Sequence, residues 1–378
     1  MSKPLHHWID EALMSIFFFT VGLEIKREIL VGELASLRRA LIPIAAAVGG
    51  MLLPAAIYLI LNYGTPAARG WGIPMATDIA FSLAVLAALG SRVPSGLRIF
   101  LSAFAIADDL GAVLVIAVFY TETIVLQNLF IALLFLAALA LAHILWIRWA
   151  LVYALLGIGV WLGILGSGVH ATVAGVLVAV FIPAKAKYNT DTFIHQVQAY
   201  LSRFECEPGN CGYTVLLNKN HLDAVQAIED ACYDVATPLQ RLEHGLQSWI
   251  TLLILPLFAL ANAGLVLTCA TITKALIEPV TLGSVLGLVL GKPLGISLFT
   301  CGAVRLLNAP LPSDVSWRQV AGASILGGIG FTMSLFISGL SFASSSLTSF
   351  SKLGIISGSI ISAVLGLIVL GLWGKRPK

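Results

Sequence analysis

Four ionisable residues lie within long apolar stretches of the chain: Asp78, Asp108, Asp109 and Lys292. A charged side chain at the centre of a membrane helix costs about 2.5–3.5 kcal/mol on insertion scales. Four such residues in one chain therefore indicate function, and the alternative is a buried structural ion pair. Lys292 is the natural counter-ion for one of the aspartates, although that use can be purely structural.

The adjacent residues Asp108 and Asp109 have the chemistry to hold either protons or a small cation. Consecutive residues of an α-helix point about 100° apart, so both carboxylates can border one cavity without lying side by side. Two close carboxylates in a low dielectric resist double ionisation and can keep protons near neutral pH. A small hard cation favours ionised oxygen ligands and expels those protons. Competition for one site is therefore sufficient to exchange a cation for protons.

The composition indicates that lipid surrounds the elements that hold these residues. Of the 378 residues, 58% are hydrophobic and 11% are charged, whereas about a quarter are charged in soluble domains. The mean hydropathy is +0.96. These values exclude a cytosolic enzyme, a disulfide-stapled secreted domain and a disordered chain, and a net charge of +3 is too small to imply nucleic acid. We expect an all-α polytopic membrane protein.

Apolar runs of roughly 17 to 25 residues predict eleven transmembrane helices. They cover residues 8–24, 41–63, 72–90, 97–120, 124–146, 149–166, 168–183, 249–267, 281–304, 320–340 and 353–373. We expect them to form a single transmembrane domain, 1–378, in which 184–248 is the one long polar connection.

Basic residues near the ends of spans are retained in the cytoplasm, so their distribution orients the predicted helices. Of the 22 lysines and arginines, 17 fall in one set of alternate connections, four in the opposite set, and Lys292 within the membrane. The 184–248 connection and the C-terminus are therefore expected in the cytoplasm. Eleven spans then place Met1 outside, although residues 1–8 contain no leader. We expect either a missing first helix or an unusual insertion of the first span, and a true eleven-span protein is the alternative.

The predicted span 72–90 carries a backbone irregularity beside an ionisable residue. Pro74 removes a helical hydrogen bond, and Thr77 offers a hydroxyl next to Asp78. This span therefore begins with a non-helical segment that can reach the site.

A second irregularity lies in the predicted span 320–340, where glycines cluster between Gly327 and Gly330. Glycine alone also serves close helix packing, but the cluster predicts a break. Both irregular spans are the middle members of groups of three, 41–120 and 281–373, which predicts an inverted repeat with a site near the membrane midplane.

The 184–248 connection predicts a loop followed by helices. Residues 189–214 indicate a loop, whereas apolar residues at helical spacing from Asn220 predict an amphipathic helix on the membrane surface or against the bundle. Thr237 and Pro238 have the residue types of an N-cap and a first helical position. The five cysteines imply no disulfide framework.

Seven motifs make the chain similar to a known family. They are Leu13–Glu28 (LMSIFFFTVGLEIKRE), Ala76–Ser82 (ATDIAFS), Phe104–Ala112 (FAIADDLGA), Ser167–Gly175 (SGVHATVAG), Leu255–Gly264 (LPLFALANAG), Gly291–Phe299 (GKPLGISLF) and Gly327–Ser334 (GGIGFTMS). The chain closely resembles the NhaA-type sodium/proton antiporters, which are built from inverted repeats. The resemblance implies twelve transmembrane helices, of which the first is absent here, and two discontinuous helices that cross.

The resemblance also implies a function and roles for individual residues. A member exchanges cytoplasmic Na+ or Li+ for external protons by alternating access, in a bacterial inner membrane. Asp109 matches the principal carboxylate for cation and proton, Asp108 its neighbour in the Na+ site, and Lys292 the lysine that pairs with Asp108. Thr77 and Asp78 match the crossing point, where Asp78 offsets the N-terminal dipoles of the half-helices and Lys292 the C-terminal ones.

Other matching residues belong to regulation by pH. Glu24, Arg27, Glu28, Glu243 and His244 match a cytoplasmic cluster associated with pH response, and His170 matches a histidine linked to the same response, with a packing histidine as the alternative. The implied partners are Na+, Li+, H+ and lipid, without a cofactor. A homodimer is possible, but the β-hairpin that some members use to dimerise would precede Met1.

Alternative functions differ in chemistry or in coupling. A cation-coupled symporter of similar fold and a cation channel would both suit intramembrane charges. An intramembrane enzyme is not expected: an aspartyl protease needs Gly-x-Gly-Asp, which neither Asp78 nor Asp109 has, and a prenyltransferase needs the third carboxylate of Asp-Asp-x-x-Asp, which is absent after Asp108.

Overall fold

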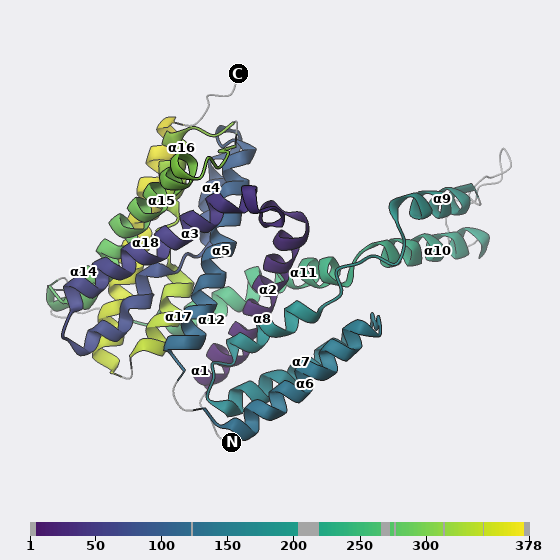
Figure 1. The fold of residues 1–378 in the computed structure, drawn as a ribbon, viewed down its shortest axis with the longest axis horizontal. Coiled ribbons are helices and arrows are strands. Elements are labelled where there is room, and N and C mark those ends of the chain that lie inside the picture. The colour runs from purple at the N-terminus through teal and green to yellow at the C-terminus, as the bar shows by residue number, and fades with distance from the viewer. Residues whose placement is uncertain are drawn as a thin grey trace.

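The computed structural model describes residues 5–121, 124–202, 219–265, 273–275, 277–312, 314–342 and 344–373. Helices dominate this part of the chain, and none of its residues is in a β-strand (Figure 1). The all-α fold is therefore confirmed. Three of the five cysteines, Cys206, Cys211 and Cys269, lie outside the described residues.

Seven uninterrupted helical rods in the described part are long and apolar enough to cross a membrane. They are α3 (Leu37–Asn62), α5 (Ser95–Phe119), α6 (Leu126–Ile144), α7 (Ala150–Ser167), the rod of α11 (Pro238–Trp249), η7 (Ile250–Ile254) and α12 (Leu255–Asn262), the rod of α14 (Pro279–Leu286), η8 (Gly287–Gly291) and α15 (Lys292–Leu306), and α18 (Ser345–Trp373). Each matches one predicted span.

Two further predicted spans are bent helix pairs, which brings the number to nine if each pair is one span. The first pair is the 3-10 segment η3 (Pro66–Met75) followed by α4 (Ile79–Ala88), with a bend of 43°. The second is α16 (Trp317–Leu326) followed by α17 (Phe331–Ser341), with a bend of 46°. Both breaks lie where proline and clustered glycines predicted them.

The last two predicted spans differ from expectation. The first forms a longer helical run, from α1 (Leu5–Trp8) through η1 (Ile9–Leu13) to α2 (Met14–Val31), and the second half of α2 is charged. In place of the span 168–183 stands α8 (Thr172–Phe181), which at ten residues is about 15 Å long, half of a bilayer core of about 30 Å. Gly168 ends the preceding helix with a left-handed φ of 86°, so the chain turns before α8 begins. The count of eleven spans stays a prediction.

The helices form two bundles with separate hydrophobic cores. The crossing bundle comprises α3, η3, α4, α5 and α14 to α18, with Phe100, Phe104, Ile296 and Leu326 in its core. The flanking bundle comprises α2, α6, α7, α8 and α11, and its hydrophobic core is a different cluster of buried residues from that of the crossing bundle. A third cluster around Phe18 of α2 joins the two bundles. In Figure 1, α3 and α14–α18 lie on the left, and α6, α7 and α8 lie in the lower centre.

Close backbone approach places α15 directly against α3. A Cβ atom added to Gly295 would lie 2.1 Å from the carbonyl oxygen of Gly49, and one added to Gly49 would lie 2.3 Å from the carbonyl oxygen of Gly295. Larger residues at either position would separate the helices, because small residues are what permit such contacts in membranes. This contact fixes the depth at which Lys292, one turn earlier on α15, enters the bundle.

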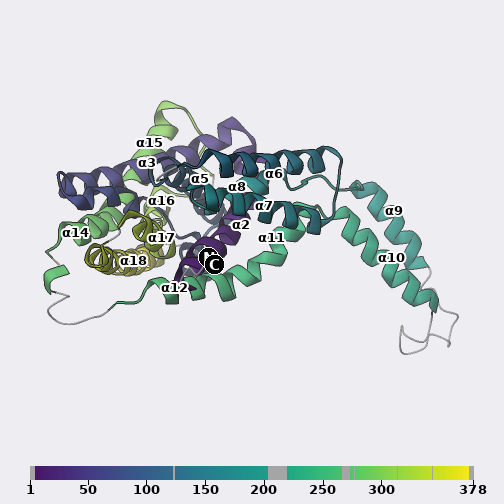
Figure 2. The same ribbon diagram turned by 90° about the horizontal axis from the view of Figure 1, so that it is seen from below.

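The polar connection differs only in part from expectation: the helix predicted from Asn220 is confirmed, and a further helix precedes it. Residues 203–214 of the predicted loop lie outside the described residues. The two helices form a hairpin. Its arms are α9 (Thr190–Leu201) and α10 (Lys219–Val235), which pack against each other and project from the bundle (Figure 2). The loop prediction is wrong for α9, whose N-cap Asn189 accepts a hydrogen bond from the Thr192 N–H. The predicted start of the next helix is confirmed: Thr237 and Gln240 form a capping box at the N-terminus of α11. Two short 3-10 turns, η2 (Glu33–Ala35) and η4 (Gly90–Arg92), complete the described elements.

Candidate ion-binding site

The two broken helices meet through hydrogen bonds between their interruptions. The Asp78 N–H donates to the Ile329 carbonyl at 2.7 Å, and the Thr77 hydroxyl donates to the Gly327 carbonyl at 2.9 Å. One turn into α4, the Ser82 hydroxyl donates to the Leu326 carbonyl at 3.0 Å. Backbone groups that the breaks leave without helical partners are thus satisfied across the crossing, as a low-dielectric interior requires.

Asp78 serves the N-termini of two half-helices with one carboxylate. Its Oδ1 accepts from the Phe81 N–H at 3.1 Å in the first turn of α4. Its Oδ2 accepts from the Thr332 N–H at 3.0 Å and from the Thr332 hydroxyl at 2.5 Å, in the first turn of α17. A carboxylate at a helix N-terminus is stabilised by the unpaired N–H groups and the dipole. Asp78 therefore has the geometry of a structural anchor for the crossing.

Lys292 and Asp108 form an ion pair that is fully buried. The distance from Lys292 Nζ to Asp108 Oδ2 is 2.6 Å, and neither side chain has exposed surface. The same ammonium donates to the Thr77 hydroxyl at 2.5 Å and lies 5.6 Å from the centre of the Phe104 ring. Of the three intramembrane aspartates, Asp108 is thus the one that the lysine neutralises, and Thr77 links this pair to the crossing.

Asp109 is the exception among the four intramembrane charges. It is completely buried on α5, next to Asp108 in the chain, yet within the described structure neither of its carboxylate oxygens has a hydrogen-bond partner. One oxygen of Asp108, Oδ1, is also without a partner there. A buried polar atom without a partner costs about 1–3 kcal/mol, and an ionised one more. Such carboxylates are suited to reversible binding of a proton or a cation rather than to a permanent structural hydrogen bond.

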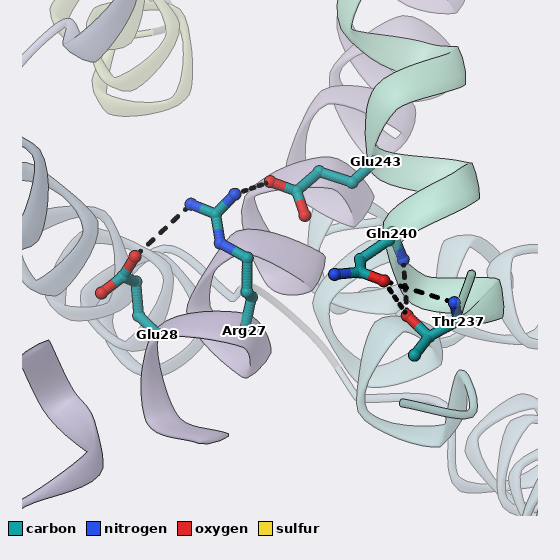
Figure 3. A network of polar contacts seen from close by, with 5 residues as sticks. All are labelled: Arg27, Glu28, Thr237, Gln240 and Glu243. Carbon is teal, nitrogen blue, oxygen red and sulfur yellow. Dashed lines mark hydrogen bonds and ion pairs between the residues drawn. The ribbon is translucent and has the colours of Figure 1, made fainter. Parts of the chain in front are cut away.

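The expected cytoplasmic cluster is partly assembled (Figure 3). Arg27 of α2 donates a hydrogen bond from Nη1 to Glu243 Oε1 of α11, and its Nη2 lies 3.4 Å from Glu28 Oε1. Glu28 Oε2 in turn accepts from the Glu33 N–H at 3.0 Å. Glu24 lies near enough to Arg27, Glu28 and Glu243 to interact with them electrostatically. Four residues of α2 and α11 therefore form one charged network.

The two histidines expected in the pH response lie outside this network. His244 is exposed on α11, next to the buried Glu243. His170 lies between α7 and α8: its Nε2 is 3.2 Å from the Tyr120 carbonyl and its Nδ1 is 4.0 Å from Glu11 Oε1. Those contacts would satisfy a packing histidine, and the role of His170 in the pH response stays a prediction.

Comparison with known proteins shows to which family the chain belongs. An Na+/H+ antiporter NhaA 2 of Syntrophotalea carbinolica is 48% identical over 376 residues, which are 100% of this chain and 85% of the relative. An Na+/H+ antiporter NhaA of Koribacter versatilis is 50% identical over 371 residues, 98% of this chain and 80% of the relative. The sequence profile of the family Na+/H+ antiporter 1 matches residues 1–370. The chain belongs to this family. The resemblance inferred from the seven motifs is confirmed, and the antiporter names describe transporters rather than enzymes.

Thr332, at the crossing of the two broken helices, was not singled out from the sequence. Thr332 is 1% exposed and supplies both of the α17 hydrogen bonds to Asp78. Its position two residues after Gly330 was the available signal, because this is the first turn of the predicted helix, where N–H groups have no partner within the helix. The partner of that hydroxyl is 254 residues away, so only the fold could identify it.

Proposed function

We propose that this protein is a secondary active transporter that exchanges cytoplasmic Na+ or Li+ for external protons. The observation that carries the proposal is Asp109, a fully buried carboxylate whose two oxygens have no hydrogen-bond partner among the described residues, beside an aspartate whose charge is already offset by Lys292. The family membership and the antiporter names of the relatives support the same reaction.

Exchange follows from competition for the Asp108–Asp109 site. With protons bound, Asp109 is neutral, and its burial costs least in that form. A small hard cation prefers ionised carboxylate oxygens, so its binding displaces the proton from Asp109 and competes with Lys292 for Asp108. One site can hold either the cation or the proton but not both at once. This competition is sufficient to couple the movement of the two ions.

Access to the site alternates, in this proposal, because the crossing bundle and the flanking bundle move relative to each other. Each bundle has a hydrophobic core of its own, and the two meet through the third cluster around Phe18, so in this proposal the movement takes place at that contact while the packing within each bundle is preserved. The crossing itself is fixed by Asp78 and by backbone hydrogen bonds within one bundle. Movement at the boundary would therefore expose the aspartates to one side at a time without disassembling the site.

The cytoplasmic network of Glu24, Arg27, Glu28 and Glu243 sets the pH dependence of exchange in this proposal. Arg27 and Glu243 join α2 to α11, so loss of this ion pair would alter the contact between two helices rather than the aspartate site. We place the network and the C-terminus on the cytoplasmic face of a bacterial inner membrane, as the distribution of basic residues predicts.

Everted membrane vesicles that hold a pH gradient test the function directly. Addition of Na+ should dissipate the gradient in vesicles with the wild-type protein, and Asp109→Asn should abolish this response. A cation channel would instead conduct Na+ without moving protons, and a symporter would take up an organic solute with the cation. Failure of Na+ to dissipate the gradient, or a full response with Asp109→Asn, would overturn the proposal.

A further inference from the structure

The C-terminus of α8 is capped by side chains from two other helices. Lys26 of α2 donates from Nζ to the Val180 carbonyl at 2.6 Å and to the Ile182 carbonyl at 2.5 Å. The carbonyl between them, that of Phe181, accepts from Nδ1 of His143 on α6 at 2.8 Å. The last carbonyls of a helix have no partner within it, and cations near them are favoured. Lys26 and His143 thus take three consecutive acceptors.

This cap joins four helices of the flanking bundle at one point. Lys26 brings α2 to the end of α8, and His143 brings α6. Immediately afterwards, the Pro183 carbonyl accepts from the Leu239 N–H in the first turn of α11, at 3.1 Å. Farther along α8, a Cβ atom on Gly175 would lie 2.3 Å from the Ser15 carbonyl of α2, so the two helices touch backbone to backbone. The relative register of α2 and α8 is therefore closely defined.

The two residues next to Lys26 connect the register of α2 and α8 to the charged network and to the aspartate-bearing helix α5. Arg27 reaches across to Glu243 of α11. Ile25 packs in a buried cluster with Ile106 of α5, two residues before Asp108. A displacement of α2 along α8 would therefore move both the charged network and the packing behind the aspartate pair.

We propose that Lys26 is a positioning residue for exchange: by holding the C-terminal carbonyls of α8, it fixes α2 so that Arg27 meets Glu243 and Ile25 packs against the aspartate-bearing helix. The proposal deepens the proposed function and depends on it. Lys26 touches neither substrate nor aspartate in this scheme, and it acts through its two neighbours in the chain.

Lys26 acts as a hydrogen-bond donor to backbone within a charged neighbourhood. The titratable and charged groups on the helices that meet there are Glu24, Arg27 and Glu28 on α2, His143 on α6, Arg98, Asp108 and Asp109 on α5, Arg241, Glu243 and His244 on α11, and Lys185 and Lys187 after α8. Helix α8 itself has no charged residue. Partial burial lowers the pKa of the Lys26 ammonium. Its hydrogen bonds to helix-end carbonyls are what compensate for that burial.

The test measures exchange in everted vesicles over a range of pH for three variants at equal protein amounts. Lys26→Met removes the donors and keeps the apolar stem, whereas Lys26→Arg keeps charge and donors. Lys185→Met is the matched control, because it removes one exposed positive charge from the connection that follows α8. Each variant is also made with Glu243→Gln, which removes the negative charge that pairs with Arg27.

We expect Lys26→Met to lower the maximal rate about tenfold, as small misplacements of a site do, and to shift the pH of half-maximal exchange. Lys26→Arg and Lys185→Met should resemble the wild type. With Glu243→Gln present, Lys26→Met should produce no additional pH shift. If Lys26 merely stabilised the fold, the amount of protein would fall while the pH profile stayed in place, and that result would overturn the proposal.

Two further outcomes separate this inference from the function on which it rests. Absence of Na+-dependent proton movement in the wild type would refute the proposed function itself. Normal exchange in the wild type together with an unaltered Lys26→Met profile would refute only the positioning role. Should Lys26→Met fail to accumulate, Lys26→Gln, which keeps an N–H donor without charge, should still shift the pH of half-maximal exchange relative to the wild type; an unchanged profile would overturn the proposal.

Discussion

Two lysine–aspartate pairs in this protein have the same N–O distance, 2.6 Å, in opposite surroundings. Lys292 and Asp108 are both fully buried, whereas Lys187 and Asp234, at the base of the α9–α10 hairpin, have side chains that are 51% and 24% exposed. An exposed pair contributes about 0–1 kcal/mol to stability. Breaking a buried pair by removing one partner costs about 3–5 kcal/mol. Environment, and not distance, therefore distinguishes the pair at the proposed transport site from the pair at the base of the hairpin.

Removal of each lysine should give the largest contrast between the two pairs. We expect Lys292→Met to lower the free energy of unfolding by about 3–5 kcal/mol, because Asp108 is left buried and uncompensated. Lys187→Met should lower it by less than about 1 kcal/mol. Denaturant unfolding of the purified protein in detergent measures both. Equal losses for the two variants would contradict the comparison.

The double variant Lys292→Met with Asp108→Asn sharpens the same point. It removes both charges, so it should recover part of the stability that Lys292→Met loses, with a coupling of about 1–3 kcal/mol between the two positions. No recovery would mean that Lys292 stabilises the protein through Thr77 or by packing, rather than through Asp108.

The anchor of the crossing predicts an intermediate effect. Thr332→Val removes the hydroxyl that donates to Asp78 and leaves a buried carboxylate with one fewer partner, at a cost of about 1–3 kcal/mol. Thr65→Val is the control, because its hydroxyl bonds the Asn62 carbonyl at an exposed position and the change should cost less than about 0.5 kcal/mol. Thermal unfolding checks both variants. A Thr332 variant as stable as the control would argue against the anchoring role of Asp78.

The pair of Arg27 and Glu243 lies between the two extremes, with side chains 36% and 8% exposed. Arg27 lowers the pKa of the neighbouring Glu24 carboxyl, so loss of the positive charge in Arg27→Gln should let this group hold its proton to higher pH. The pH profile of exchange should therefore move about half a unit toward alkaline pH, while the maximal rate stays within about twofold. Vesicle assays over a pH series measure this shift. A shift toward acid pH, or none, would show that the network does not act through its carboxylates.

Ionic strength should produce the smallest difference. The Debye length is about 8 Å at 0.15 M salt, so added salt screens the exposed Lys187–Asp234 pair and hardly affects Lys292–Asp108. The stability loss caused by Lys187→Met should shrink by a few tenths of a kcal/mol at high salt, whereas the loss caused by Lys292→Met should persist. Both are obtained by repeating the unfolding measurements at two salt concentrations.

Much of this site could be predicted from sequence because charge is rare in the membrane. Asp78, Asp108, Asp109 and Lys292 stand out against apolar surroundings, and Pro74 and the Gly327–Gly330 cluster mark the breaks that the structure contains. Local sequence is sufficient to identify these four residues, because a charged side chain within a membrane is energetically costly and therefore rare.

Other features depend on contacts that no local pattern contains. The length of α8 follows from the turn at Gly168, and the α9 helix follows from its cap at Asn189 and its packing on α10. The partners of Thr332 and Lys26 are 254 and 154–156 residues away in the chain. A hydroxyl or an ammonium in the sequence shows that a bond must be made but not with which residue.

Proton release on cation binding is the most direct test of the account, since it examines the site without a membrane. When Na+ is added to the purified wild-type protein in weakly buffered detergent solution, we expect protons to appear in the solution as the cation occupies the Asp108–Asp109 site. The same addition to Asp109→Asn should release none, whereas Asp234→Asn should behave as the wild type. Undiminished proton release from Asp109→Asn, or cation binding to the wild type without any release, would contradict it.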